Sequence, residues 1–345
     1  MTCWDPALWL RRCRPFGFDC RVSAERLRAM KPLKFLSVLS SLVLTCVGFA
    51  ADAVFTDPAA AGADFQLQGE YVGEKCGAQV IALGDGKFHL VGWGNGLPVE
   101  VADAEKKQEI DGALENGAVH FKNEEWDATL KDGAITGTNK DGTTRVLKKT
   151  ERKSPTMGAN PPPGAIVLFD SKNADAWKNG KMDKDGNLEC GTVSKQEFGD
   201  FTAHIEFRTP FKPAARGQGR GNSGVYLQDR YEVQVLDSFG LKGENNECGG
   251  IYTKHKPKVN MCFPPLSWQT YDIEFEAAKW DADGKKTKDA IVTVKHNGVL
   301  IHDHAAVNGS TTSSGRKDGP GPGPFQLQNH GNPVVFRNIW GVEKK

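Results

Sequence analysis

The sequence predicts an all-β protein in which a small antiparallel module precedes a two-sheet jelly roll. Three observations support this. The 345 residues include 39 glycines and 18 prolines, which favour many turns. Short apolar runs alternate with period two, as in half-buried strands. Few stretches show the 3.6-residue period of a helix. The length suggests two domains, and the net charge of +1 gives no reason to expect nucleic acid or an anionic membrane as a partner.

The N-terminal region has the pattern of a targeting segment. From Met30, two lysines precede an apolar run that ends in small residues near Ala50 and Ala53. This is typical of a secretory signal peptide, with a retained membrane anchor as the alternative. We interpret 30–53 as the signal and 1–29 as a mis-assigned start or a long n-region. The mature chain is then periplasmic or extracellular, without a membrane span, in an oxidising compartment.

Four cysteines follow the predicted signal. Cys248 and Cys262 bracket a short loop, and closing a loop of about 15 residues stabilises a fold by about 3 kcal/mol in the chain-entropy model. We therefore predict a disulfide between them. A metal site is the alternative, although the spacing matches no zinc pattern. Cys76 and Cys190 lie in different predicted domains and are left undecided.

Residues 54–150 are predicted to form the small module. Asp-Gly and Asn-Gly pairs at 85–86, 111–112, 116–117, 132–133 and 141–142 separate short alternating runs at 78–83, 87–93 and 118–123. Such pairs are the strongest short-range hairpin signals. The module contains no recognisable site. Trp93 and Trp126 would stack on a sugar or, as is commoner, fill a core.

Residues 151–163 contain Ser-Pro and Pro-Pro-Pro and are predicted to be an extended linker. The jelly roll then occupies 164–345. Phe201, Ala203, Ile205 and Phe207 alternate with polar residues, so they share one strand face. We expect a two-residue hairpin at Asp229-Arg230 and another at 297–298. About ten strands are expected, in the runs 165–170, 201–209, 223–228, 231–236, 268–277, 289–303, 324–328 and 333–342.

The strand at 231–236 carries the main candidate site. Tyr231, Val233 and Val235 share one face, so Glu232 and Gln234 point the other way, together with Tyr226 and Gln228 of the preceding strand. Strict alternation places Asp237 on the core side, but a β-bulge near 235–236 would turn it toward Glu232. Two such acids are candidates for acid–base catalysis. A polar strand face that only contacts solvent is the alternative.

Other polar groups lie in the C-terminal half. Gln328, His330 and Arg337 surround a Gly-Asn-Pro turn, and histidine is the natural proton shuttle near neutral pH. Lys254, in the loop between Cys248 and Cys262, would reach a substrate or be solvated. His302 and His304 have strand spacing and would hold a metal only with a further ligand. A divalent metal ion therefore stays open as a cofactor.

Five ordered stretches, at 221–240, 248–252, 268–275, 294–303 and 325–340, resemble the 3-keto-disaccharide hydrolase domain family over nearly all of 164–345. The resemblance implies a concanavalin-like jelly roll related to lectins and glucanases. The substrate it implies is a sugar already oxidised at C3 by a separate oxidoreductase.

A C3 ketone acidifies the C2–H, so a base can remove that proton and the group on C1 can leave. On this resemblance Glu232, Asp237 and His330 are candidate catalytic residues. Arg230 and Gln234 would bind hydroxyls or the enolate. The sequence departs from relatives at Asn329, where an aspartate is common. A non-catalytic carbohydrate-binding module and a laminarinase-like glucanase are the alternative functions.

Overall fold

A computed structural model describes residues 53–99 and 107–344 of the chain. The predicted signal peptide at 30–53 and the segment before it fall almost entirely outside the described residues, so export stays a prediction. Among the described residues, no helix has the length and apolar character needed to cross a membrane.

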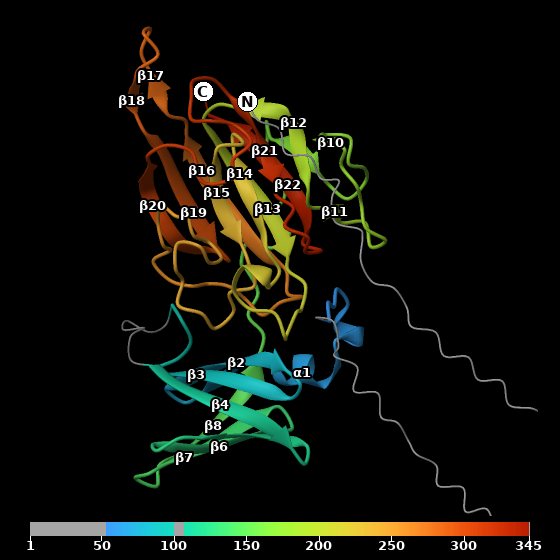
Figure 1. The fold of residues 1–345 in the computed structure, drawn as a ribbon, viewed down its shortest axis with the longest axis vertical. Helices are drawn as coiled ribbons and strands as arrows, with labels where there is room; N and C mark the ends of the chain where they lie inside the picture. The colour runs from blue at the N-terminus through green and yellow to red at the C-terminus, as the bar shows by residue number, and fades with distance from the viewer. Residues whose placement is uncertain (1–52, 100–106, 345) are drawn as a thin grey trace, which may run out of the picture. The chain divides into compact units, whose positions relative to one another are not determined.

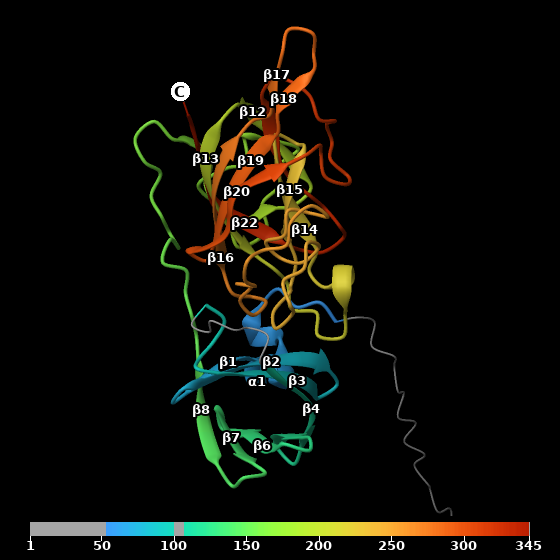
Figure 2. The ribbon, with the colours of Figure 1, turned by 90° about the vertical axis from the view of Figure 1, so that its left-hand side faces the viewer.

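The first part of the described chain is a closed, antiparallel, eight-stranded barrel (Figure 2). Two short helical segments, η1 (Pro58–Ala60) and α1 (Gly62–Leu67), precede it. Each strand pairs with the next, and β1 pairs with β8. The strands are β1 (Gly69–Gly73), β2 (Cys76–Gly84), β3 (Lys87–Gly94), β4 (Lys107–Glu115), β5 (Ala118–Lys122), β6 (Trp126–Lys131), β7 (Ala134–Asn139) and β8 (Thr144–Thr150).

Four of the five predicted Asp-Gly or Asn-Gly turns connect strands of this barrel, but the one at 111–112 is wrong. Asp111 and Gly112 lie inside β4. A Cβ added at Gly112 would lie 2.4 Å from the Phe121 ring of β5. Position 112 therefore needs glycine because the inward-facing Phe121 ring fills the space that a side chain would take. The Asp111-Gly112 pair is not a hairpin turn.

The second part is a β-sandwich, as predicted (Figure 1). One sheet has the order β10-β12-β21-β14-β15, and the other β11-β22-β13-β16-β19-β20 with β9 beside β22. A hairpin of β17 and β18 lies outside both sheets. The strands are β9 (Ile166–Phe169), β10 (Trp177–Lys178), β11 (Leu188–Glu189), β12 (Thr192–Phe198), β13 (Phe201–Arg208), β14 (Ser223–Leu227), β15 (Tyr231–Val235), β16 (Gln269–Glu276), β17 (Lys279–Trp280), β18 (Lys286–Lys288), β19 (Ala290–His296), β20 (Val299–Val307), β21 (Gly323–Leu327) and β22 (Val335–Glu343).

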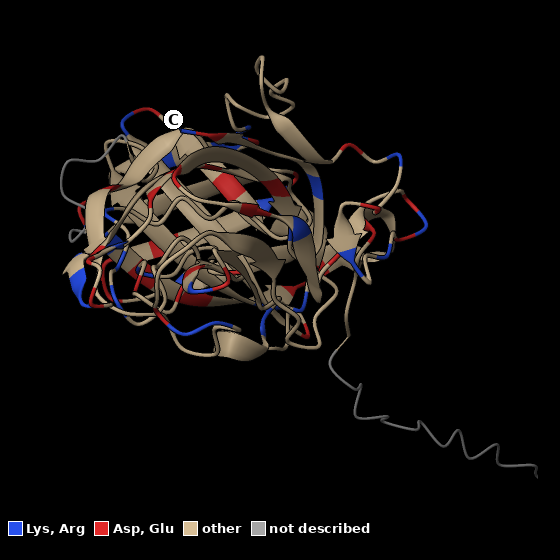
Figure 3. Cartoon of the chain, turned by 90° about the horizontal axis from the view of Figure 1, so that it is seen from above, with Lys and Arg blue, Asp and Glu red and all other residues tan. Residues whose placement is uncertain are grey.

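The core of the sandwich lies between the two sheets and confirms the alternation. Phe201, Ala203, Ile205 and Phe207 of β13 all enter it. The hairpin at 297–298 is also confirmed, because His296 pairs with Val299 and both intervening residues have positive φ, as a type I′ turn requires. Acidic and basic residues are interspersed along the ribbon, in keeping with the balanced composition (Figure 3).

The hairpin predicted at Asp229-Arg230 is one residue longer. Leu227 pairs with Tyr231, so the loop is Gln228–Arg230, and Gln228 and Asp229 have φ of 54° and 57°. The Arg230 guanidinium donates to the carbonyl oxygens of Lys317, Pro320 and Gly321. This side chain ties the hairpin to the 308–322 segment.

The linker packs onto the outer face of the larger sheet. Thr156 Oγ1 donates to Asp272 Oδ2 at 2.6 Å, and the Gly158 amide donates to Glu206 Oε1 at 2.6 Å. His204 and Glu206, on the polar face of β13, are therefore fully buried. The prediction of an extended linker is wrong for 154–159, where Met157 N donates to Ser154 O and Ala159 N donates to Thr156 O in consecutive turns. These turns hold the segment against the sheet.

Candidate active site

The polar face of the smaller sheet carries the candidate site. Strands β14 and β15 pair residue for residue, with Tyr226 opposite Glu232 and Gly224 opposite Gln234. Because Val225, Val233 and Val235 enter the core, these polar side chains share the opposite face, as predicted. Two loops pair with the open edge of β15 beside these side chains. Tyr252 N donates to Glu232 O at 3.0 Å, and Thr311 N donates to Arg230 O at 2.9 Å.

Glu232 lies in a small hydrogen-bond network. The Tyr226 hydroxyl is 2.8 Å from Glu232 Oε2 and 2.8 Å from the Thr312 carbonyl oxygen, and it accepts from Gln328 Nε2 at 3.0 Å. A tyrosine hydroxyl has one proton and cannot donate to both oxygens. While Glu232 is ionised, the hydroxyl donates to Glu232 Oε2, and when Glu232 is protonated it is free to donate to the Thr312 carbonyl oxygen instead. The geometry therefore accommodates both protonation states of Glu232.

Burial raises the pKa of Glu232 to about 7, against an opposing hydrogen bond from Tyr226. Only 2% of the residue is exposed, and a desolvated carboxylate is disfavoured relative to the neutral acid. A group that is half ionised near neutral pH is suited to general acid–base catalysis. Burial also raises the pKa of the Tyr226 hydroxyl, so Tyr226 stays protonated.

Glycine at 224 makes room for the carboxyl group. A Cβ added there would lie 2.1 Å from Glu232 Oε1, although the backbone φ is ordinary. Four buried carboxamide oxygens on the same face have no hydrogen-bond partner in the structure: Asn222 Oδ1, Gln234 Oε1, Gln326 Oε1 and Gln328 Oε1. Buried acceptors are costly unless a donor meets them. Sugar hydroxyls are donors of this kind.

Asp237 does not join Glu232, and the predicted bulge is wrong. Strand β15 ends at Val235 without a register shift, and Asp237 N donates to Arg220 O at 3.0 Å. Val235 and Leu236 both pack in the core, and Asp237, which is 1% exposed, is directed to Arg220 instead of Glu232. Its Oδ2 accepts from Arg220 Nε at 2.6 Å. Burial raises the pKa of Asp237, opposed by Arg220. This carboxylate therefore holds the chain after β15 in place.

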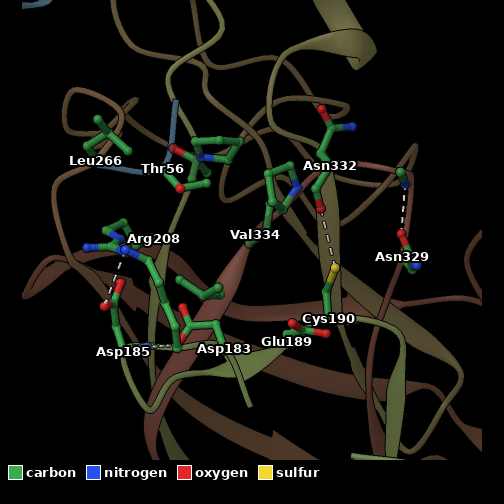
Figure 4. A pocket seen from close by; sticks show the side chains of 16 residues that line it. Thr56, Asp183, Asp185, Glu189, Cys190, Arg208, Leu266, Asn329, Asn332 and Val334 are labelled. Atoms are coloured by element: carbon green, nitrogen blue, oxygen red, sulfur yellow. Dashed lines mark hydrogen bonds and ion pairs between the residues drawn. The ribbon is translucent and has the colours of Figure 1, made fainter. Parts of the chain in front are cut away.

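His330 lies on an exposed loop and is not part of the Glu232 network. Its neighbours Asn329 and Asn332 line a polar cavity of about 510 Å³ (Figure 4). Asp183, Asp185, Glu189 and Arg208 also line it, and Asp185 and Arg208 point toward one another in the view. The Asp183 carboxylate stabilises the turn that follows it, because its Oδ1 accepts hydrogen bonds from the backbone amides of residues 185 and 187. The 328–332 loop thus lies between this cavity and Glu232.

Of the other predicted site residues, Tyr226, Gln234 and Gln328 are brought together around Glu232. Gln228 instead donates to Phe198 O and accepts from Arg230 inside the hairpin loop. Lys254 Nζ donates to Asn308 O at the surface. Arg337 belongs to the other sheet. Its Nε donates to Glu206 Oε2, and its guanidinium stacks 4.0 Å from the Trp268 ring centre.

Two residues near the site were not predicted. Gln218, in the turn η2 (Gly217–Gly219), accepts from Asn222 Nδ2 and from Gln234 Nε2, each at 3.1 Å. Asn222 precedes Gly224 by two residues, so period-two alternation would have found it. Gln218 comes from a loop and carried no signal.

The structure does not show the predicted disulfide. Cys248 and Cys262 are both free and buried. The two thiols contact one another, and Cys248 Sγ also lies 3.3 Å from the Tyr271 hydroxyl and Cys262 Sγ 3.5 Å from Leu236 O. Within 53–99 and 107–344, no group of three or more histidines, cysteines or carboxylates is placed to hold a metal ion. His302 instead lies 2.7 Å from Gly249 O.

One sheet of the sandwich thus carries a buried acid with a raised pKa beside unpartnered carboxamide oxygens. Among protein families, residues 164–341 match the 3-keto-alpha-glucoside-1,2-lyase-like domain. The chain belongs to this family, whose description supports a glycoside-acting, hydrolase-like enzyme.

Three solved structures from Parabacteroides distasonis ATCC 8503, each described as a proposed glycosyl hydrolase, are similar to this chain. The first is 36% identical, with a TM-score of 0.49, over 53% of this chain and 85% of its own. The second is 18% identical, with a TM-score of 0.38, over 53% and 94%. The third is 18% identical, with a TM-score of 0.37, over 52% and 99%. No protein of curated function matches the chain.

Proposed function

We propose that this protein cleaves 3-keto-glycosides, with Glu232 as the acid–base group. The observation that carries the proposal is a carboxyl group with a pKa of about 7 beside unpartnered carboxamide oxygens on one sheet face. An ordinary sugar C2–H is far too weak an acid for such a base. A ketone at C3 acidifies that proton, because the electrons left at C2 delocalise into the carbonyl as an enolate.

The proposed reaction proceeds in balanced steps. Glu232, as carboxylate, takes the C2 proton, and an enolate forms across C2 and C3. The enolate electrons then form the C1–C2 double bond while the C1–O bond breaks, and the leaving oxygen takes up a proton. Water adds back, with its hydroxyl at C1 and its hydrogen at C2. The net reaction is hydrolysis. Tyr226, 2.8 Å from Glu232, would hold the carboxyl group in place by its hydrogen bond during these proton transfers.

The carboxamides would hold the sugar during these steps. Gln234 and Asn222 each keep one oxygen without a partner while their nitrogens contact Gln218. Their oxygens would accept hydrogen bonds from substrate hydroxyls, and Gln328 would do so beside Tyr226. A site built to hydrogen-bond hydroxyls discriminates strongly against ligands that lack them.

A laminarinase-like double displacement fits less well. Retaining glycosidases place two carboxyl groups about 5–5.5 Å apart. Among the described residues, no second carboxylate joins the Glu232 network, and Asp237 is paired with Arg220. Elimination needs one base and a polarised ketone, which is the chemistry that a single acid supplies.

A carbohydrate-binding module is the second candidate, because unpartnered acceptors would also bind an unmodified glycan. A product assay separates the two. The purified chain, with and without a chelator, is incubated with 3-keto-trehalose, a 3-keto-glucoside and the unoxidised parent sugars. The enzyme proposal expects release of the aglycone or second sugar from the keto compounds alone. Tight calorimetric binding of the parent sugars with no turnover of any keto sugar would support the binding module instead.

We also propose that the protein is exported, on the signal-like pattern at 30–53, and that it acts after an oxidoreductase. The substrate class requires a prior two-electron oxidation of a sugar C3 hydroxyl. Nothing in the Glu232 network would perform that oxidation, so a separate enzyme must supply the ketone.

A further inference from the structure

The eight-stranded barrel encloses a cavity that the proposed reaction does not use. It has a volume of about 300 Å³, at the lower end of the range for small-molecule pockets. Eight strands leave an interior that is either filled by side chains or wide enough for one small ligand. Here the barrel does both, since one end is filled by Tyr71, Phe88, Phe121 and their neighbours and the other is hollow.

Small residues at paired positions create the hollow end. Ala78 pairs with Gly92 across β2 and β3, and Ala128 pairs with Gly137 across β6 and β7. One step further along, the pairs are Val80 with Leu90 and Leu130 with Ile135, which fill the interior. The change from large to small side chains therefore occurs on both sides of the barrel at the same level.

The glycine at 92 is not required by the fold. A Cβ added there would meet nothing closer than 3.5 Å, and its φ is ordinary. This differs from Gly112, where the Phe121 ring occupies the space. Because unfilled apolar cavities destabilise a protein, a hollow that a larger side chain would fill points to use by a ligand.

The lining defines the chemistry of the ligand. The walls are apolar or glycine except for Gln108 and Arg145, and the inward-facing Trp126 offers a flat ring. Arg145 is exposed, and its Nη1 reaches a backbone oxygen, Glu74 O, at 3.4 Å. Among the described residues no carboxylate pairs with it. A sugar carries several hydroxyl groups and would need more than two polar partners. We therefore do not interpret Trp93 and Trp126, which also line the cavity, as a stacking site for a glycan.

We propose that the barrel binds a small, flat, apolar ligand with one anionic group, such as an aromatic carboxylate. The apolar part lies beside Trp126 in the space left by Ala78, Gly92, Ala128 and Gly137, and the anion meets Arg145 at the rim. The site is separate from the Glu232 network, and the binding does not depend on turnover of a keto sugar.

Titration calorimetry on the full chain tests this with 2-naphthoate as the probe. We expect saturable one-site binding that Gly92→Leu abolishes by filling the cavity. Gly199→Leu is the matched control, because that surface glycine has open space and ordinary φ. Arg145→Gln should weaken 2-naphthoate by about tenfold, as loss of a hydrogen bond to a charged group does, and leave neutral 2-naphthalenemethanol unchanged. Lys148→Gln, on the outer face of the same strand, should affect neither probe.

The proposal is overturned if 2-naphthoate gives no saturable heat at millimolar concentration, if Gly92→Leu folds and binds as wild type does, or if trehalose binds more tightly than either probe. If circular dichroism shows that Gly92→Leu is unfolded, the proposal is tested instead by comparing the affinities of Arg145→Gln and Lys148→Gln for 2-naphthoate. Equal affinities of these two variants for 2-naphthoate would then contradict the placement of the anion.

Discussion

Glu232 lowers the stability of the folded protein at neutral pH, and its replacement by glutamine should show by how much. Burial moves its pKa from 4.5 to about 7. In the unfolded chain the carboxyl group ionises from about pH 4.5, whereas in the fold it stays protonated up to about pH 7. Folding is therefore penalised increasingly between these values and fully above them. At about 1.36 kcal/mol per pH unit, the penalty reaches about 3 kcal/mol at pH 8.

The Glu232→Gln variant keeps the shape and removes the charge. In urea unfolding followed by tryptophan fluorescence, we expect wild type and variant to differ little at pH 4.5. At pH 8 the variant should be more stable, by up to about 3 kcal/mol. Glu244→Gln, an exposed acid in the same part of the chain, serves as the control and should change neither value. An equal effect of Glu232→Gln at both pH values would refute the argument that the carboxyl group is desolvated.

Further predictions concern the surroundings of this acid. Tyr226→Phe removes a hydrogen bond that lowers the pKa of Glu232, so the rising limb of the pH–activity profile should move upward by about one pH unit; an unmoved limb would exclude this contact as the cause. Gly224→Ala should abolish turnover, because its methyl group would displace the Glu232 carboxyl group, whereas Gly199→Ala should be silent in the same assay. Arg220→Met leaves Asp237 buried without its cation and should cost about 3–5 kcal/mol in denaturant unfolding, and a loss below about 1 kcal/mol would contradict the pairing. Cys248 and Cys262 are both buried, so a thiol reagent should label them only after unfolding; labelling that also requires a reductant would show that the pair is bonded.

The alternation of single strands predicted much of the fold and half of the site. Period two in 201–207 and 231–235 identified which residues enter the core, and it placed Glu232, Gln234 and Tyr226 on one face. These are local properties of a strand, and they depend only on which positions are apolar. The type I′ turn at 297–298 was predictable for the same reason, because Asn-Gly suits the required backbone conformation.

What the sequence could not predict depends on contacts between distant segments. Asp237 is held by Arg220, 17 residues earlier, and His204 is covered by a linker that reads as solvent-exposed. The Asp-Gly pair at 111–112 predicts a turn, and only the packing of Phe121 against Gly112 shows why a glycine lies inside a strand. The bulge expected at 235–236 assumed that Asp237 must face the substrate, but burial with an arginine satisfies it equally well. These contact partners are brought together by the fold topology, which a short sequence pattern does not reveal.

The most direct test of the account follows hydrogen at C2. A 3-keto-glucoside is incubated in D₂O with wild type, with Glu232→Gln or without protein, and the products are examined by NMR at matched times. Proton abstraction followed by water addition predicts deuterium at C2 of the product with wild type, above the spontaneous exchange, and its loss with Glu232→Gln. A product that retains its C2 hydrogen, or equal labelling by both proteins, would contradict Glu232 as the base.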